Sequence, residues 1–286
     1  MSAFGPLVST GWLEEHLHDP DLRALDCSMR LVPVDGGGMR AEGMRSAWAE
    51  GHLPGAAYVD LREELSDPQS PLPLMMPPVA RFSAAMGRLG IGPASRVLLY
   101  DTGGHSWATR VWWMLRAVGF DAAAVLEGGL AQWKAEGRPL STDAPAHAPV
   151  TFEAMPRPGV FADRRAVQAA ISRGDTLLVN ALSADEHAGR TSRSARPGRI
   201  PGSLNVPAAS LVEPQPGGFR PLEDLRSRFA AAGVLGAPRI ITYCGGGISA
   251  TVDAFTLLRL GARDVAVYDG SLAEWAADPS LPLETG

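Results

Sequence analysis

The chain has 286 residues, which is enough for about two domains that each bury a core. With 45% hydrophobic and 20% charged residues its composition is ordinary for a globular protein, and its net charge of −5 argues against a nucleic-acid partner, which would need a basic surface. The chain has only two cysteines, which argues against a disulfide framework, and its cysteines and six scattered histidines show no metal-ligand spacing. It has no apolar run long enough to span a membrane. We therefore expect a cytoplasmic protein without metal or cofactor.

Apolar segments along the chain predict strands and helices in alternation. The predicted strands are Leu22–Cys27, Ala56–Val59, Arg96–Tyr100, Thr176–Asn180, Ser203–Val206, Arg239–Tyr243 and Val265–Tyr268. The predicted helices are Trp12–Leu17, Val79–Leu89, Ser106–Val118, Arg165–Ser172, Leu222–Ala232 and Ser249–Leu260. Because nearly continuous apolar strands that alternate with helices are typical of parallel sheets covered on both faces, the sequence predicts an α/β fold. Ligands of such folds bind beyond the carboxyl ends of the strands.

Three blocks of the chain occur twice, in the same order. Residues 51–56 align with 198–203, 96–106 with 239–249, and 125–133 with 267–275. Matched blocks in a constant order predict two homologous domains. We place these domains at residues 1–142 and 158–286, joined by a linker at 143–157 within a stretch rich in Pro, Ala, Ser and Thr.

The most informative segment follows the predicted strand that ends at Tyr243. It reads Cys244-Gly245-Gly246-Gly247-Ile248-Ser249 and leads into a predicted helix. A tight glycine-rich turn before a helix N-terminus points successive backbone N–H groups into one small bowl. Such amides stabilise a thiolate, so the pattern predicts that Cys244 is a nucleophile for an anionic or easily polarised substrate. An inert core thiol is the alternative, since many cysteines after apolar strands are simply buried.

Three further residues are interpreted through the repeat and the same loop. The first copy has Asp101 at the position of Cys244, a carboxylate that fits the same bowl but cannot act as a sulfur nucleophile. The hydroxyl of Ser249 is expected to cap the helix that begins there, and it could also bond a sulfur carried by Cys244. Cys27 lies in a predicted strand without a glycine turn, so we expect it to be a buried core thiol.

These motifs together resemble one known family. The two copies, the Gly51–Ala56 block, the Asp269-Gly270-Ser271 block and the cysteine loop are similar to the tandem rhodanese-type sulfurtransferases, the 3-mercaptopyruvate/thiosulfate sulfurtransferase family. The stretches Ser66–Pro73 and Arg110–Arg116 are similar to the mercaptopyruvate branch of that family. The resemblance covers nearly the whole chain and implies two rhodanese-like domains, of which the first is catalytically silent and forms one side of the cleft.

The resemblance also implies a reaction. Cys244 would take a sulfane sulfur from a small donor, thiosulfate or 3-mercaptopyruvate, and would become a persulfide. It would then pass the sulfur to a nucleophilic acceptor such as cyanide or a thiol, and a thioredoxin-like reductant is one such thiol partner.

Four positions depart from the family pattern and leave the donor open. Gly246 stands where the mercaptopyruvate branch has Ser and the thiosulfate branch has Lys, and Leu74 stands where a His is common. Leu182 and Glu186 replace two arginines that serve the substrate pocket in many relatives. The persulfide chemistry therefore carries over, whereas the sequence does not identify the donor, the physiological acceptor or the oligomeric state.

Other residues are candidates for holding the charge of an anionic donor. Arg190 and Arg196 belong to a loop in which an arginine recurs at every third position, and Arg30 follows the strand of Cys27. A solvated charge run is the alternative interpretation of these arginines. Asp60 matches an aspartate of the mercaptopyruvate branch, and a turn or helix cap is its alternative role.

Two other functions compete with sulfur transfer. A cysteine-dependent phosphatase or arsenate reductase also grips an oxyanion with a thiolate. It needs an arginine about six residues after the cysteine to bind the oxyanion, and this chain has Ala250 and Thr251 there. A non-catalytic or carrier-type rhodanese module that binds a sulfur-delivery partner stays open because Leu182 and Glu186 are unusual. Retention of the thiol at Cys244 favours the enzyme.

Overall fold

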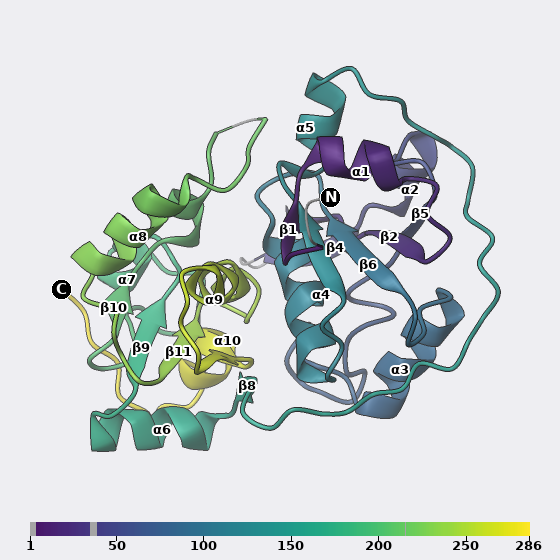
Figure 1. Cartoon of the computed structure of the whole chain (residues 1–286). Coiled ribbons are helices and arrows are strands. Elements are labelled where there is room, and N and C mark those ends of the chain that lie inside the picture. Colours follow the sequence, from purple (N-terminus) through teal and green to yellow (C-terminus); the bar gives the residue numbers. More distant parts are fainter. Residues whose placement is uncertain (1–3, 35–38, 215) are drawn as a thin grey trace.

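The computed structural model describes residues 4–34, 39–214 and 216–286, which form two α/β units side by side (Figure 1). Each unit is built on a five-stranded sheet whose neighbouring strands are all parallel. Helices lie against these sheets, so the α/β class predicted from the alternating pattern is confirmed. No helix within the described ranges is long and apolar enough to cross a bilayer.

The first unit has the strand order β1-β7-β6-β2-β5. Its strands are β1 (Leu7–Val8), β2 (Leu22–Asp26), β5 (Ala56–Tyr58), β6 (Arg96–Tyr100) and β7 (Ala123–Leu126). Its helices are α1 (Thr10–His16), α2 (Arg45–Glu50), α3 (Val79–Arg88), α4 (Ser106–Ala117) and α5 (Gly129–Ala135). An antiparallel hairpin outside this sheet consists of β3 (Met29–Pro33) and β4 (Met39–Gly43).

The second unit repeats this plan, with the order β10-β9-β11-β12-β8. Its strands are β8 (Phe161–Ala162), β9 (Leu177–Asn180), β10 (Leu204–Asn205), β11 (Ile240–Tyr243) and β12 (Val265–Tyr268). Its helices are α6 (Arg164–Arg173), α7 (Ala184–His187), α8 (Leu222–Ala231), α9 (Ala250–Arg259) and α10 (Ser271–Trp275), with a short 3-10 helix η1 (Ala208–Leu211). Counted from β1 and from β8, corresponding strands take the same places, so the repeat in the sequence is a repeat of the fold.

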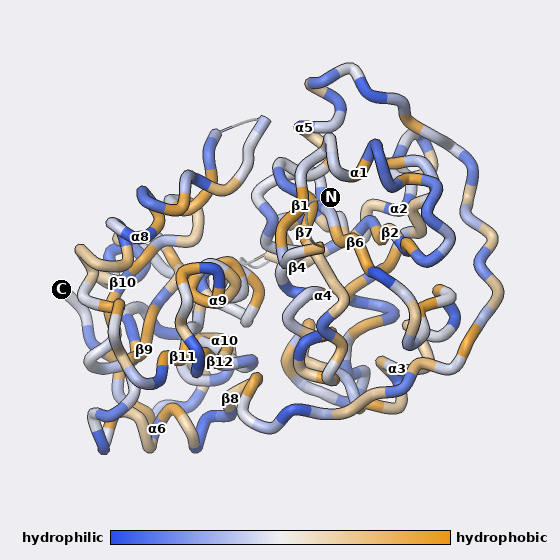
Figure 2. The backbone as a smooth tube through the Cα atoms, in the orientation of Figure 1, coloured by the Kyte–Doolittle hydropathy of each residue, from blue (hydrophilic) through white to orange (hydrophobic). Residues whose placement is uncertain are grey.

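The central strands are buried because they carry apolar side chains on both faces of each sheet. All four residues of β11 and the last four of β6 are buried. Figure 2 shows hydrophobic colours along β9 and β11 in the interior of the second unit. Burial on both faces fixes the strands firmly, so the turns at their carboxyl ends are held on a rigid support.

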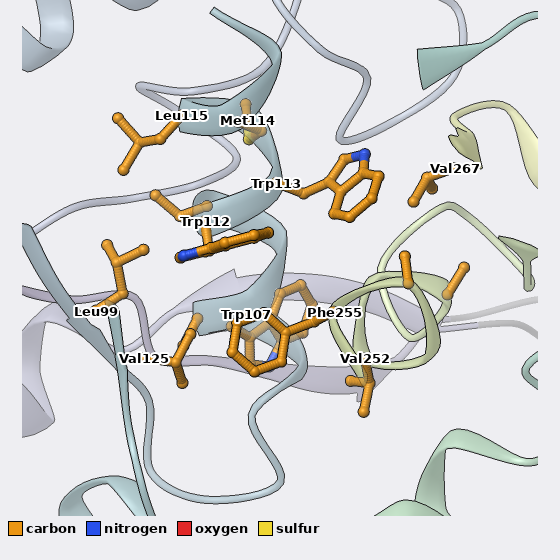
Figure 3. Close-up of a cluster of buried hydrophobic side chains, with 14 of the residues drawn as sticks. Leu99, Trp107, Trp112, Trp113, Met114, Leu115, Val125, Val252, Phe255 and Val267 are labelled. Carbon is orange, nitrogen blue, oxygen red and sulfur yellow. The ribbon is translucent and has the colours of Figure 1, made fainter. Parts of the chain in front are cut away.

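The two units meet through α4 and α9, the helices that follow the two glycine-rich turns. The ring of Trp112 on α4 meets that of Phe255 on α9 edge-on, with ring centres 5.0 Å apart. The hydroxyls of Thr109 and Thr251 lie 2.8 Å apart across the same contact. Figure 3 shows the apolar side chains that the two helices bury here. Contacts between large aromatic side chains such as these stabilise the interface between the two units.

The segment between α5 and β8 follows the surface of the first unit closely. The N–H of Val150 donates to the carbonyl of Gly87 over 3.0 Å, and that of Met155 donates to the carbonyl of Val118 over 2.8 Å. The side chain of Phe152 is buried in the core. The Pro-rich connection is therefore packed along one unit rather than spanning the gap as a free tether.

Candidate active site

Cys244 lies where β11 ends, at the carboxyl edge of the second sheet, and its side chain is almost completely buried. Its N–H donates to the Oγ of Ser271 over 3.1 Å, and its carbonyl accepts from the N–H of Leu272 over 3.0 Å. The hydroxyl of Ser271 donates in turn to the carbonyl of Tyr268 over 2.8 Å. The backbone of the cysteine is thus fixed by the turn between β12 and α10.

The three glycines after the cysteine have different surroundings. Among the described residues, no atom lies within 4 Å of a Cβ built on Gly245 or Gly246, so the loop is open on that side. Gly247 has a φ of +76°, and a Cβ there would lie 2.5 Å from the carbonyl oxygen of Asp269. Only glycine fits at position 247 without strain, whereas the two preceding glycines keep the space above the loop free.

Ser249 does not cap α9, so that sequence-based expectation is wrong. Its backbone is already helical, with a φ of −58° and a ψ of −31°, and its side chain makes no capping hydrogen bond. A capping residue has extended backbone, which lets its side chain reach back to the first amides of the helix. The second expected role of Ser249, a bond to sulfur on Cys244, stays a prediction.

The first unit shows what a turn of this kind binds. Asp101 stands at the end of β6 in the place of Cys244, and its side chain is fully buried. Its carboxylate accepts backbone N–H bonds from Gly103 (2.9 Å), His105 (3.3 Å), Trp107 (3.0 Å) and Ala108 (3.2 Å). Burial raises the pKa of Asp101, and the four amides act against that rise. The turn therefore gathers four donors around one acidic group.

The repeat alignment identifies the corresponding positions in the cysteine loop. The counterparts of Gly103, His105 and Trp107 are Gly246, Ile248 and Ala250. Backbone amides directed at a sulfur favour its ionised form, because they solvate the negative charge that the thiolate carries. Cys244 thus occupies the place that a carboxylate fills in the first unit.

Arg110, on α4 of the first unit, reaches the cysteine loop across the interface. Its side chain is fully buried, and its Nη1 donates to the carbonyl of Gly247 over 3.2 Å, while its Nη2 donates to the carbonyl of Leu74 over 2.7 Å. Nη1 also lies 2.6 Å from Oδ1 of Asp269, a close charge contact without the alignment of a hydrogen bond. Oδ2 of Asp269 accepts the N–H of Met76 over 2.8 Å.

Sequence reasoning missed Arg110 as a residue of the site. The one available signal was the similarity of Arg110–Arg116 to the mercaptopyruvate branch, and that similarity assigns no partner to the arginine. The contact with Gly247 joins residues 137 positions apart, from different units. Only the packing of α4 against α9 brings them together.

Two of the predicted substrate-binding arginines lie on the surface and are already paired. Arg30 is on the β3–β4 hairpin, where its Nη2 lies 3.1 Å from the carboxylate of Glu42. Arg190 pairs with Asp185 at 2.6 Å, and both side chains are exposed. Exposed pairs of this kind contribute little to stability. Whether these arginines bind a donor is not decided by the contacts, and their role stays a prediction.

The other two predicted residues have structural partners. Oδ1 of Asp60 accepts the N–H groups of Arg62 and Glu63 over 2.9 and 3.0 Å, which is the turn role that the sequence offered as an alternative. The guanidinium of Arg196 donates to the carbonyls of Trp275 (3.3 Å), Ala276 (2.9 Å) and Asp278 (2.6 Å). These carbonyls lie at the C-terminal end of α10 and just beyond it, whereas the cysteine loop contacts the start of that helix. A role of either residue in donor binding remains a prediction.

Leu182 and Glu186, which replace arginines of the family pattern, follow the strand next to β11. Asn180 pairs with Tyr243 in register, so the segment after β9 runs beside the cysteine loop. The side chain of Leu182 packs against the hydrophobic core. Glu186 forms a capping box at the start of α7. This flank of the site presents an apolar side chain and a carboxylate that already has partners.

Cys27 is a buried core thiol, as its sequence context indicated. Its side chain has no exposed surface, and its Sγ lies 3.7 Å from the carbonyl of Leu25. Burial raises the pKa of the Cys27 thiol well above its usual value. A thiol that resists ionisation is a poor nucleophile, so Cys27 is poorly suited to attack a donor.

Comparison with known proteins agrees with this fold and repeat. The rhodanese-like domain family matches residues 9–136 and 163–278. The chain is 33% identical to the 3-mercaptopyruvate sulfurtransferase of Escherichia coli (strain K12) over 280 residues, which cover 97% of each protein. It is 33% identical to the thiosulfate sulfurtransferase of Rattus norvegicus over 292 residues, which cover 98% of this chain and 95% of the relative.

A solved structure shares the whole architecture. The crystal structure of SseA from Escherichia coli, described as a 3-mercaptopyruvate sulfotransferase, matches with a TM-score of 0.83 and 32% identity. The match covers 93% of this chain and 98% of SseA. The two-domain fold, the internal repeat and the identity to these relatives agree with one another, and the chain belongs to the rhodanese-like domain family, whose domain it carries in two tandem copies.

Proposed function

We propose that this protein is a sulfurtransferase in which Cys244 carries a sulfane sulfur from a small donor to a nucleophilic acceptor. The thiolate of Cys244 attacks the sulfane sulfur of the donor and forms a new S–S bond. The bond between that sulfur and the rest of the donor breaks, and the leaving group takes the electron pair. Thiosulfate releases sulfite, and 3-mercaptopyruvate releases the enolate of pyruvate, which then takes up a proton. An acceptor thiolate or cyanide then attacks the outer sulfur and restores the thiolate of Cys244.

One observation carries this assignment. The glycine-rich turn occurs twice in the fold, and in the first unit its amides surround the carboxylate of Asp101. In the second unit the same position holds a thiol. In the proposed reaction the corresponding amides of the cysteine loop stabilise the thiolate before attack and after release of the sulfur, so the loop assists both halves of the reaction.

The relatives support the reaction class and leave the donor open. Full-length similarity extends both to a 3-mercaptopyruvate sulfurtransferase and to a thiosulfate sulfurtransferase, each at 33% identity. The loop itself offers no charged side chain, since its second and third positions are Gly245 and Gly246. We therefore assign the enzyme to sulfur transfer and keep thiosulfate and 3-mercaptopyruvate as the two donors to compare.

A reduced thiol is the acceptor that fits the compartment we propose. Both cysteines of the chain are free, which suits a reducing cytoplasm. There a thioredoxin-like reductant would supply a thiol that attacks the persulfide of Cys244 and leaves with the sulfur.

The assignment is tested by replacing each cysteine in turn and measuring thiocyanate formed from cyanide. We expect Cys244→Ser to abolish transfer with either donor, because serine forms no persulfide. Cys27→Ser should retain most of the activity, because that thiol is buried and away from the glycine loop. Substantial thiocyanate production by Cys244→Ser would refute the assignment.

A further inference from the structure

We infer that Arg110, from the silent first unit, is the positioning residue that directs an amide of the cysteine loop at the sulfur of Cys244. This inference rests on the proposed function of Cys244. It explains what the silent unit contributes to catalysis, beyond forming one side of the cleft.

The argument begins with the planarity of the peptide bond. In a trans peptide the carbonyl of one residue and the N–H of the next point in opposite directions. The carbonyl of Gly247 points outward to Nη1 of Arg110, 3.2 Å away. The N–H of Ile248, in the same peptide unit, must then point to the opposite side, into the loop.

The first unit shows where that N–H leads. His105 is the counterpart of Ile248 in the repeat, and its N–H donates to Oδ1 of Asp101 over 3.3 Å. Asp101 is in turn the counterpart of Cys244. In this inference the Ile248 amide takes the corresponding direction, toward the sulfur, and the bond from Arg110 to the carbonyl of Gly247 fixes it.

The repeat also supplies an internal comparison, because the interface contains the same network twice. Asp269 follows β12 and accepts the N–H of Met76. Its counterpart Glu127 follows β7 and accepts the N–H of Phe219, which is the counterpart of Met76. Each unit thus holds an acidic residue that reaches across the interface to a backbone amide of the other unit.

The two networks differ in the place of their arginine on the interface helices. Arg110 on α4 corresponds to Asp253 on α9 in the repeat, and both are fully buried. Neither carboxylate oxygen of Asp253 has a hydrogen-bond partner among the described residues. Burial raises the pKa of Asp253 well above its usual value, which keeps this carboxyl neutral. Both networks thus contain an arginine, since Arg259 on α9 lies over the ring of Phe219 and its charge acts on Glu127. Among the described residues, Arg110 is the one that donates to a carbonyl of the cysteine loop.

A structural role alone would not require this asymmetry, since both networks join the same two units. The loop that needs a guanidinium is the one whose amides must stabilise a thiolate that forms and disappears during turnover. The turn around Asp101 keeps its shape without such support, because the carboxylate binds four amides permanently. In the cysteine loop no carboxylate binds the amides, and the hydrogen bond from Arg110 to the carbonyl of Gly247 holds the turn instead.

The experiment compares matched pairs of variants in protein that carries Cys27→Ser, where Cys244 is the only thiol. Arg110→Met with Asp269→Asn removes both charges of one network and leaves no unpaired buried ion. Asp253→Asn with Glu127→Gln removes the acidic groups of the other network and leaves Arg259 in place. Arg110→Lys with native Asp269 tests whether a single charge without the planar fork suffices. Each variant is assayed for thermal unfolding, for kcat and KM of sulfur transfer, and for the rate of Cys244 alkylation.

We expect the Arg110→Met/Asp269→Asn protein to fold. Its kcat and its rate of Cys244 alkylation should fall tenfold or more, while KM should change by less than about threefold. A fall in kcat without a comparable change in KM indicates loss of an interaction made in the transition state. Arg110→Lys should recover part of the loss, and Asp253→Asn/Glu127→Gln should keep wild-type rates. Wild-type alkylation and kcat in the folded Arg110→Met/Asp269→Asn protein would overturn the inference. So would an equal loss in both double variants. Because alkylation requires no sulfur donor, it reports on the loop even if Cys244 proves not to carry sulfur.

Discussion

At the scale of single residues, the loop glycines Gly246 and Gly247 are neighbours with opposite constraints. Position 246 is open, whereas position 247 combines a left-handed backbone with a carbonyl oxygen where a Cβ would lie. A sequence motif of repeated glycines does not distinguish the two cases. The structure does, because it shows which glycine the backbone needs and which one merely leaves room.

Gly247→Ala is expected to damage both stability and activity. A left-handed backbone costs a residue with a Cβ roughly 1–3 kcal/mol, and the clash with the Asp269 carbonyl displaces the loop further. Gly246→Ala, the matched control, should change the free energy of unfolding by less than about 0.5 kcal/mol. Denaturant unfolding and kcat of both variants decide this, and equal behaviour of the two alanine variants would contradict it.

His105 should make the stability of the fold depend on pH. Burial, with a smaller contribution from the charge of Arg259, lowers the pKa of His105 to about 4. In the unfolded chain a histidine titrates near 6.5, so between about pH 6.5 and about pH 4 the unfolded chain binds a proton that the folded protein does not. The free energy of unfolding therefore falls as the pH drops through this window, by up to about 1.4 kcal/mol per pH unit.

The test is His105→Phe, which keeps a ring stacked on Phe219 but removes the titration. Buried acids such as Asp253 have the opposite sign, because their raised pKa favours the folded state at low pH. The difference between the variant and wild type isolates the histidine from them. We expect this difference in unfolding free energy to shift in favour of His105→Phe as the pH drops from about 7 to about 4. A difference independent of pH would refute the assignment.

Cys244 can be proposed as the nucleophile from sequence because the pattern that suggests it is local. Strand, glycine turn and helix are contiguous, and Cys244 sits at a fixed place among them. The contribution of Arg110 could not be predicted, since it depends on packing between units. The prediction that Ser249 caps α9 was wrong for a related reason. The sequence shows a suitable residue near the start of the helix, but its backbone angles determine whether the side chain reaches the first amides.

At the scale of elements, α10 connects the site to the arginine loop before β10. The helix starts at Ser271, beside Cys244, and its last carbonyls accept from Arg196. A short helix leaves most of its carbonyls without partners inside the helix, so an external cation at its C-terminal end is stabilising. Arg196 therefore supports the element that fixes the backbone of the cysteine.

Arg196→Ala should lower stability more than it changes donor binding. Loss of charged hydrogen bonds to three carbonyls is expected to cost about 1–3 kcal/mol in the free energy of unfolding. The control is Arg193→Ala in the same loop, whose side chain is exposed and lies 3.6 Å from Glu186, and it should cost less than about 1 kcal/mol. Thermal unfolding and KM for thiosulfate separate the roles. A rise in KM without loss of stability would instead show that Arg196 binds the donor.

Most elements with uninterrupted apolar runs were predicted to within one or two residues, but the buried strand β7 was not predicted although its four residues are all apolar. The ranges predicted for β6 and β12 are those observed. The β3–β4 hairpin gave no such signal, because apolar side chains such as Leu31 and Met39 are exposed on it. Strands of two residues at the sheet edges, such as β1 and β8, are too short for any periodic pattern to mark.

At the scale of the whole molecule, duplication explains the division of labour. Two copies of one fold pack through equivalent helices, and each sends an acidic residue across the interface to the other. One copy has a thiol in its turn, and the other has a carboxylate. The copy with the carboxylate contributes the buried guanidinium that contacts the cysteine loop. Sequence comparison of the two halves revealed the duplication but not this exchange of contacts.

The central claim, that sulfur travels as a persulfide on Cys244, is tested most directly by mass spectrometry of the intact protein. Cys27→Ser protein is incubated with thiosulfate or with 3-mercaptopyruvate, freed of donor, measured, and measured again after addition of cyanide. We predict a mass gain of one sulfur atom with at least one donor, located at Cys244 by peptide mapping and removed by cyanide. Turnover without any such gain, or a gain of the same size in Cys244→Ser protein, would contradict the account.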